Sequence, residues 1–138
     1  MHKTFSIATQ GPGLYEITPQ IAGWLRRDMV AEGVLTLFIQ HTSASLVIQE
    51  NADPDVPRDM SEYFHRLVPP ADDPSMCYLR HTSEGVDDMP AHIKAALLPV
   101  SLQIPVLDGE MALGNWQGIF VFEHRRRPHR RDIIAMLR

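Results

Sequence analysis

The sequence is nearly devoid of cysteine, and this scarcity excludes two kinds of site. Cys77 is the only cysteine in 138 residues, so neither an internal disulfide nor a zinc site of the Cys-x-x-Cys type can form. Its neighbours Met76 and Tyr78 predict a buried thiol rather than a nucleophile. A chain without disulfides is typical of a reducing compartment, and we expect a cytoplasmic protein.

Long apolar runs and an excess of positive charge are also missing. No stretch approaches the roughly 18 consecutive apolar residues of a membrane-spanning helix, and residues 1–5 lack the apolar core of a signal peptide. Lys and Arg number 13 against 17 Asp and Glu, which gives a net charge of −4. We therefore expect neither a membrane nor a nucleic acid as a partner.

Several catalytic motifs are absent as well. The sequence contains no G-x-S-x-G, G-x-x-x-x-G-K-S/T, H-E-x-x-H or G-x-G-x-x-G, which sets aside the chemistry that each of these motifs carries. Hydrophobic residues make up 44% and charged residues 22% of the chain, as in ordinary globular proteins. A chain of this length forms one domain, which we expect to span residues 1–138.

Apolar residues recur at helical spacing in three segments, which we expect at about 18–33, 53–68 and 88–98. Thr18, followed by Pro19, predicts the N-cap of the first helix, and Gly33 the left-handed residue that ends it. The second helix is expected to stop before Pro69.

Alternating or continuous β-forming residues predict seven or eight strands. The expected strands cover 3–8, 34–39, 44–49, 76–79, 102–106, 111–113, 119–123 and 132–137. Asp108-Gly109 predicts a two-residue hairpin turn with positive φ at both positions, and Pro105 is expected at a sheet edge or a bulge. The expected fold class is α+β: a single domain of mainly antiparallel β-sheets with about three helices.

The first loop with more polar groups than a core needs is 41–45, followed by Glu50 and Asn51. It combines His41 with three hydroxyl side chains at the end of a strand. Hydroxyls and backbone N–H groups in such a place can hold a phosphate. The alternative is that Thr and Ser only stabilise a bend in the chain, and the residues leave both interpretations open.

The second polar loop runs from His81 to His92. Asp88 and His92 are four residues apart, so they share a face if a helix begins here. On that face, the carboxylate can fix the imidazole tautomer or share a cation with it, and histidines from separate loops can complete a metal site. The alternative is that Asp88 only caps the helix and that the histidines are structural, and spacing alone favours this simpler interpretation.

Two further segments carry notable side chains. In 114–118, two glycines flank an Asn, a Trp and a Gln; we expect Trp116 in the core and Gln117 at a ligand. Between 125 and 131, five of the seven residues are Arg. Such a run can form an anion site, but a solvated face, or pairing with an acidic surface of another subunit, is the more usual outcome.

Four segments, 41–46, 50–54, 87–95 and 113–119, together resemble the YjbQ-like family, whose members are often labelled secondary thiamine-phosphate synthase. The resemblance covers about residues 5–137. It implies an α+β fold that assembles as a homotrimer around a threefold axis. It also implies a secondary activity that joins a hydroxymethyl-pyrimidine pyrophosphate to a thiazole phosphate.

The candidate site residues fall into three groups under this hypothesis. The catalytic group is Asp87, Asp88 and His92; the group that binds the phosphorylated metabolite is Thr42, Ser43, Ser45, Glu50, Asn51, Lys94 and Gln117; the metal ligands are His41, His81 and His92. The cation is zinc or magnesium; histidine ligands favour zinc, whereas the departure of pyrophosphate is typical of magnesium chemistry. The alternative function is a non-catalytic trimer that binds a metal or a phosphometabolite for regulation.

Overall fold

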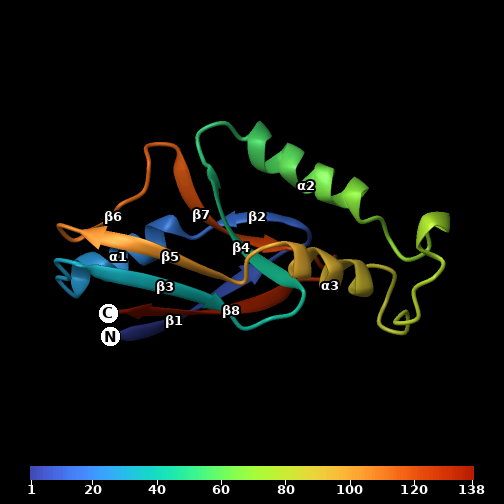
Figure 1. The fold of residues 1–138 in the computed structure, drawn as a ribbon, viewed down its shortest axis with the longest axis horizontal. Coiled ribbons are helices and arrows are strands. Elements are labelled where there is room, and N and C mark those ends of the chain that lie inside the picture. Colours follow the sequence, from blue (N-terminus) through green and yellow to red (C-terminus); the bar gives the residue numbers. More distant parts are fainter.

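Two antiparallel sheets and three helices make up the computed structural model, which describes residues 1–138 (Figure 1). The strands are β1 (His2–Thr9), β2 (Gly13–Glu16), β3 (Gly33–Ile39), β4 (Ala44–Glu50), β5 (Ser101–Leu107), β6 (Glu110–Met111), β7 (Gln117–Glu123) and β8 (His129–Leu137). The helices are α1 (Thr18–Arg27), α2 (Asp55–Leu67) and α3 (Asp88–Leu97), with a short 3-10 turn at Pro74–Met76. The α+β expectation is confirmed.

The larger sheet has the strand order β1-β8-β3-β5-β6 and the smaller sheet β2-β7-β4. Every pair in both sheets is antiparallel. The first and last strands pair along their whole length, so the two chain ends lie side by side (Figure 1).

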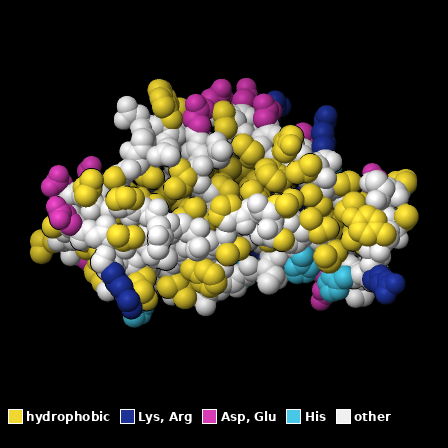
Figure 2. All heavy atoms as spheres, in the orientation of Figure 1, with side chains coloured by type: hydrophobic (Ala, Val, Ile, Leu, Met, Phe, Trp, Pro, Cys, Tyr) yellow, Lys and Arg dark blue, Asp and Glu magenta, His cyan; other side chains and the backbone are white.

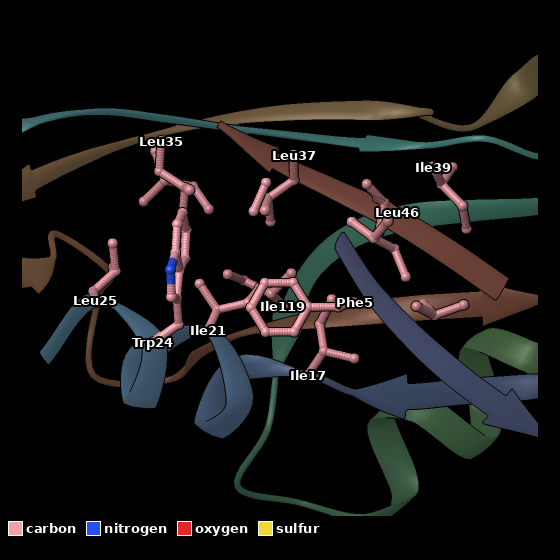
Figure 3. Packing of buried hydrophobic residues seen from close by; sticks show 14 of the residues in the cluster. Phe5, Ile17, Ile21, Trp24, Leu25, Leu35, Leu37, Ile39, Leu46 and Ile119 are labelled. Carbon is pink, nitrogen blue, oxygen red and sulfur yellow. The ribbon is translucent and has the colours of Figure 1, made fainter. Parts of the chain in front are cut away.

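The main core lies against β3, whose alternation buries Leu35, Leu37 and Ile39. Opposite these residues, α1 supplies Ile21, Trp24 and Leu25, and Figure 3 shows both sets pointing into the same apolar space. The Trp24 ring meets Phe5 of β1 edge to face, with 6.0 Å between ring centroids. This packing stabilises the sheet against α1.

Strand β7 is buried on both faces, and this places polar side chains in the interior at its end. All of its residues from Gly118 to Glu123 are buried. One face joins the main core, and on the other face Phe122 meets Phe64 of α2, with ring centroids 5.5 Å apart. Glu123 and His124, which close the strand, are 0% and 3% exposed.

The first helix begins at Thr18 as expected, but its N-cap and its C-terminal end differ from the prediction. The Thr18 hydroxyl caps nothing, because it accepts a hydrogen bond from the backbone N–H of Ile119 at 2.8 Å. The helix ends at Arg27, and Gly33 begins β3 instead. A Cβ at Gly33 would lie 2.9 Å from the Arg138 carbonyl oxygen, so this glycine permits close approach of the C-terminal strand.

Three other expectations about exposure and local structure are wrong. Residues 76–79 form no strand, because the chain makes a 3-10 turn there, and Cys77 is exposed. Trp116 is 63% exposed, because the tight 114–117 turn directs it away from the core. Cys77 and Trp116 are apolar side chains, yet no element covers them.

The expected hairpin is confirmed, since Asp108 and Gly109 have φ of 51° and 82°. Pro105 lies on β5 beside the two-residue β6, close to the sheet edge as expected. None of the three helices has the length and apolar character needed to cross a bilayer.

Candidate functional site

Three of the sequence-predicted residues meet at the start of α3. The Asp88 side chain is 4% exposed, and its Oδ2 lies 2.7 Å from His81 Nε2 and 3.2 Å from His92 Nε2. Asp88 and His92 meet because they are one helical turn apart, and the 81–87 loop turns through Gly85, at φ 110°, before α3 begins. The candidate ligand atoms of these three side chains all lie within 4.8 Å of one another. We call His81, Asp88 and His92 the triad.

A backbone carbonyl sets the tautomer of His92. Its Nδ1 lies 2.9 Å from the carbonyl oxygen of Thr42, so Nδ1 carries a proton and donates it. Nε2, which faces the Asp88 carboxylate at 3.2 Å, is then the ring nitrogen that can ligate a cation. The Thr42 carbonyl oxygen therefore orients the ring, a role that the sequence analysis expected of Asp88. A backbone carbonyl that accepts from the second ring nitrogen is usual at a metal-ligating histidine.

Arg125 holds the two aspartates in place. Its guanidinium donates to Asp87 Oδ2 at 3.0 Å, to Asp88 Oδ1, and to the carbonyl oxygen of Glu84 at 3.1 Å. The backbone N–H of Arg126 adds a bond of 2.9 Å to Asp87 Oδ2. The sequence carries no sign of this role, because the arginine run lies 37 residues further along the chain than Asp88 and nothing local links the two.

These contacts keep the carboxyl groups ionised and favour protonated His81. Burial raises the pKa of the Asp88 carboxyl, but the hydrogen bond from His81 and the charge of Arg125 outweigh it, and the pKa lies below its usual value. For Asp87, burial is likewise outweighed by the hydrogen bonds from Arg126 and Arg125, so its pKa is lowered. The hydrogen bond with Asp88 raises the pKa of His81.

His41 does not join the triad. Its Nε2 accepts a hydrogen bond from the backbone N–H of Asp132 at 2.9 Å, and its Nδ1 faces a guanidinium nitrogen of Arg131 at 3.3 Å. Burial lowers the pKa of His41, and the charge of Arg131 lowers it further. With both ring nitrogens facing donors of β8, His41 has no lone pair left for a cation, and the set of His41, His81 and His92 does not assemble.

The serine hydroxyls of the 41–45 loop are used inside the protein. Ser43 Oγ accepts from Arg131 at 2.9 Å, and Ser45 Oγ lies 2.9 Å from His124 Nε2; both serines are buried. Thr42 contributes its carbonyl oxygen to His92 and has an exposed side chain. Both serine hydroxyls therefore already have partners within the chain, whereas the predicted phosphate site in 41–45 requires unpaired hydroxyls.

Glu50, Asn51 and Gln117 lie at the far end of the small sheet. Glu50 lies five positions after Ser45 along β4, a rise of roughly 17 Å. Asn51 donates to Glu16 at 2.9 Å, and Gln117 accepts from the backbone N–H of Gly114 at 2.8 Å. The structure therefore does not bring these three predicted ligand contacts to the triad. Lys94, in contrast, lies on α3 and lines a cavity beside Asp87.

The triad suits a divalent transition metal. Two imidazole nitrogens and a carboxylate oxygen form a set that zinc and its neighbours accept, whereas magnesium prefers oxygen ligands alone. The side chains of His81 and His92 are 46% and 31% exposed, so an ion and its further ligands can approach. In Figure 2 histidines appear at the surface near the loop that leads into α3.

Comparison with known proteins gives a consistent result. The family described as "UPF0047 protein YjbQ-like" matches residues 3–138. The chain belongs to the YjbQ-like family. UPF0047 protein sll1880 of Synechocystis sp. is 49% identical over 94% of this chain and 85% of its own, and UPF0047 protein YjbQ of Escherichia coli O157:H7 is 43% identical over 98% and 95%.

Solved YjbQ-like structures share the fold. A conserved YjbQ/UPF0047 protein from Clostridium acetobutylicum superimposes with a TM-score of 0.85 at 31% identity, covering 99% of each chain. The conserved hypothetical protein TT1486 from Thermus thermophilus gives 0.84 at 28% identity, again over 99% of each chain. The YjbQ-like resemblance and the single-domain α+β architecture are both confirmed.

Proposed function

We propose that the triad binds a divalent transition-metal ion and that the protein acts there on a small phosphorylated metabolite. The observation that carries the proposal is the convergence of His81 Nε2, His92 Nε2 and Asp88 Oδ2, with the His92 tautomer already set by the Thr42 carbonyl oxygen. Arg125 keeps the Asp88 carboxylate charged and oriented before any ion arrives. Such preorganisation is what a metal ligand set requires.

The reaction we propose to test is the one that the family resemblance suggests, the joining of a hydroxymethyl-pyrimidine pyrophosphate to a thiazole phosphate. When bound, the ion would supply positive charge opposite the departing pyrophosphate. The chain's own residues hold and orient the ligands: Arg125 and the Arg126 backbone occupy Asp87, so Asp87 acts as a positioning residue rather than as a base. The proposal includes a cytoplasmic location, since the one cysteine is a free thiol.

We also propose assembly as a homotrimer, which the resemblance suggests and one surface supports. Val34 and Phe38 of β3 and Met136 of β8 are 46%, 45% and 37% exposed. They lie on the face of the larger sheet opposite the core, in register with Pro105 and Ile134 on the neighbouring strands. An apolar sheet face of this kind is typical of a subunit contact. Light scattering at micromolar concentration should return about three times 15.6 kDa.

The test of the proposed function combines metal binding with turnover. We expect metal-free protein to bind Zn²⁺ in calorimetry, and His92→Ala to weaken that binding about tenfold or more, as loss of a ligand does. His2→Ala is the matched control, since His2 is exposed on β1, and it should bind as the wild type does. If folded His92→Ala binds Zn²⁺ as tightly as the wild type does, the triad is not the metal site.

Turnover separates an enzyme from a binding protein. Wild-type protein with the two precursors and Zn²⁺, Mn²⁺ or Mg²⁺ should release pyrophosphate, and His92→Ala should not. Metal binding without any turnover would favour the alternative, a regulatory trimer that uses the same triad.

A further inference from the structure

A cavity of about 240 Å³ lies between α2, the start of α3 and the end of β7. Its lining includes Glu62 of α2, Lys94 of α3 and Asp87, which directly precedes α3. His124 and Arg126, which follow β7, also line it. Asp87 precedes Asp88 of the triad, and Arg125 bridges the two carboxylates. The cavity is therefore adjacent to the triad but is built from different side chains.

Each acidic side chain of the lining already has a cationic partner of its own. Glu62 pairs with Arg66 at 2.9 Å, and Asp87 with Arg125 at 3.0 Å. Glu123, which also lines the cavity, is fully buried and pairs with Arg131. None of these carboxylates requires a charge from inside the cavity.

The basic side chains of the lining have no such partner. Lys94 is 8% exposed, and its ammonium group makes no hydrogen bond or ion pair within the chain; Arg126 is an exposed residue whose guanidinium is likewise unpaired. Because most of Lys94 is buried, an anion beside its charge would be stabilising. The two basic groups therefore leave the cavity short of negative charge.

A buried histidine beside them is also incompletely bonded. His124 is 3% exposed; its Nε2 is bonded to Ser45 Oγ, but its Nδ1 has no partner. Burial lowers the pKa of His124 to about 3, helped by the charge of Lys94, so the ring is neutral. A neutral ring can offer one N–H, and buried polar groups of proteins are nearly always bonded. An unsatisfied ring nitrogen here is a second, independent sign of a ligand.

We infer that this cavity binds a phosphoryl-type oxyanion, with Lys94 and Arg126 supplying the charge and the His124 ring lying beside them. The volume lies below the roughly 300–1,000 Å³ of pockets that enclose a drug-sized ligand, so it suits a phosphate or pyrophosphate group rather than a whole nucleotide. This inference deepens the proposed function and rests on it for the class of metabolite. The anion site itself requires no metal, because every group that forms it belongs to the chain.

The test is calorimetric titration of the full chain with inorganic pyrophosphate and with phosphate in the presence of EDTA. We expect saturable binding by the wild type. Lys94→Met keeps the length of the side chain and removes the charge, and it should weaken binding about tenfold or more, as loss of a charge-assisted bond to an oxyanion does. Arg126→Gln should weaken binding several-fold. The control is Arg127→Gln, which removes the same charge one residue outside the lining and should bind as the wild type does.

Failure of this inference differs from failure of the triad. If His92→Ala still binds pyrophosphate in EDTA, the cavity binds the anion without the metal site, as inferred. Absence of saturable binding in EDTA, or equal loss in Arg126→Gln and Arg127→Gln, would overturn the inference. Should Lys94→Met not fold, as judged by circular dichroism, the Arg126 and Arg127 pair still decides the question.

Discussion

Two clusters in this molecule combine histidine, carboxylate and arginine, and they differ in how deeply their side chains are buried. The closed cluster consists of Arg131, Glu123, Thr9, Ser43 and His41. Both Glu123 oxygens are occupied, Oε1 by Thr9 at 2.6 Å and by Arg131 Nε at 2.7 Å, and Oε2 by Arg131 Nη2 and two backbone N–H groups. Glu123 is fully buried. A cluster so saturated is structural.

The open cluster, His81, Asp88 and His92 with Arg125 behind them, is oriented but partly exposed. Arg125 and the Thr42 carbonyl oxygen hold its members from behind. On the front, two partly exposed ring nitrogens converge on one carboxylate oxygen. Residue type alone does not distinguish the two clusters, whereas the exposure of the histidine rings at the triad does.

The largest expected effect comes from breaking the closed cluster. Arg131→Met leaves the Glu123 carboxylate buried without its cation, which should cost about 3–5 kcal/mol of unfolding free energy. Burial raises the pKa of Glu123, but its hydrogen bonds, first that from Arg131, hold it below its usual value, so the carboxylate depends on this partner. Urea unfolding measures the loss. A change below about 1 kcal/mol would show that this cluster is not the structural one.

Breaking the support of the open cluster should reduce binding more than stability. Arg125→Met removes the donors that orient Asp87 and Asp88, and Zn²⁺ affinity should fall about 10–100-fold, as with other outer partners of metal ligands. Arg127→Met is the control, since the Arg127 side chain contacts neither aspartate. Calorimetry of both variants measures the difference in Zn²⁺ affinity. Equal affinities would show that Arg125 does not support metal binding by the triad.

The smallest effect is a pH dependence specific to the open cluster. Because the bond with Asp88 raises the pKa of His81 above its usual 6.5, the contact stabilises the metal-free protein below about pH 6.5, and this stability is lost as pH rises through the raised pKa. The thermal midpoint of wild type should therefore fall relative to that of His81→Gln across this window. In the same window Zn²⁺ affinity should increase, since the ion displaces the proton. Parallel midpoint curves would contradict the first expectation.

Most regular elements could be predicted from the sequence because their signals are local. The apolar periodicity of 53–68 and the Asp108-Gly109 turn signal depend on neighbouring residues only. The structure contains both the helix and the turn that they predict. Exposure was harder to predict: Cys77 and Trp116 are apolar but uncovered, since burial depends on which distant element packs on a segment.

The site was predictable only in its local part. Asp88 and His92 are linked by helical spacing, and His81 by a short loop. Arg125 and His124, which follow β7, depend on tertiary packing for their contacts, and so do the β8 groups that occupy His41. No local sequence pattern predicts these contacts, because their partners are far apart along the chain.

The most direct test of the metal-binding triad is an anomalous-scattering map at the zinc edge from crystals of the protein grown with Zn²⁺. We expect one ion within about 2.0–2.2 Å of His81 Nε2, His92 Nε2 and an Asp88 oxygen. The Thr42 carbonyl oxygen should still accept the His92 Nδ1–H. An ion bound elsewhere, or a triad that stays as hydrogen-bonded as it is here at saturating zinc, would contradict the proposed metal site.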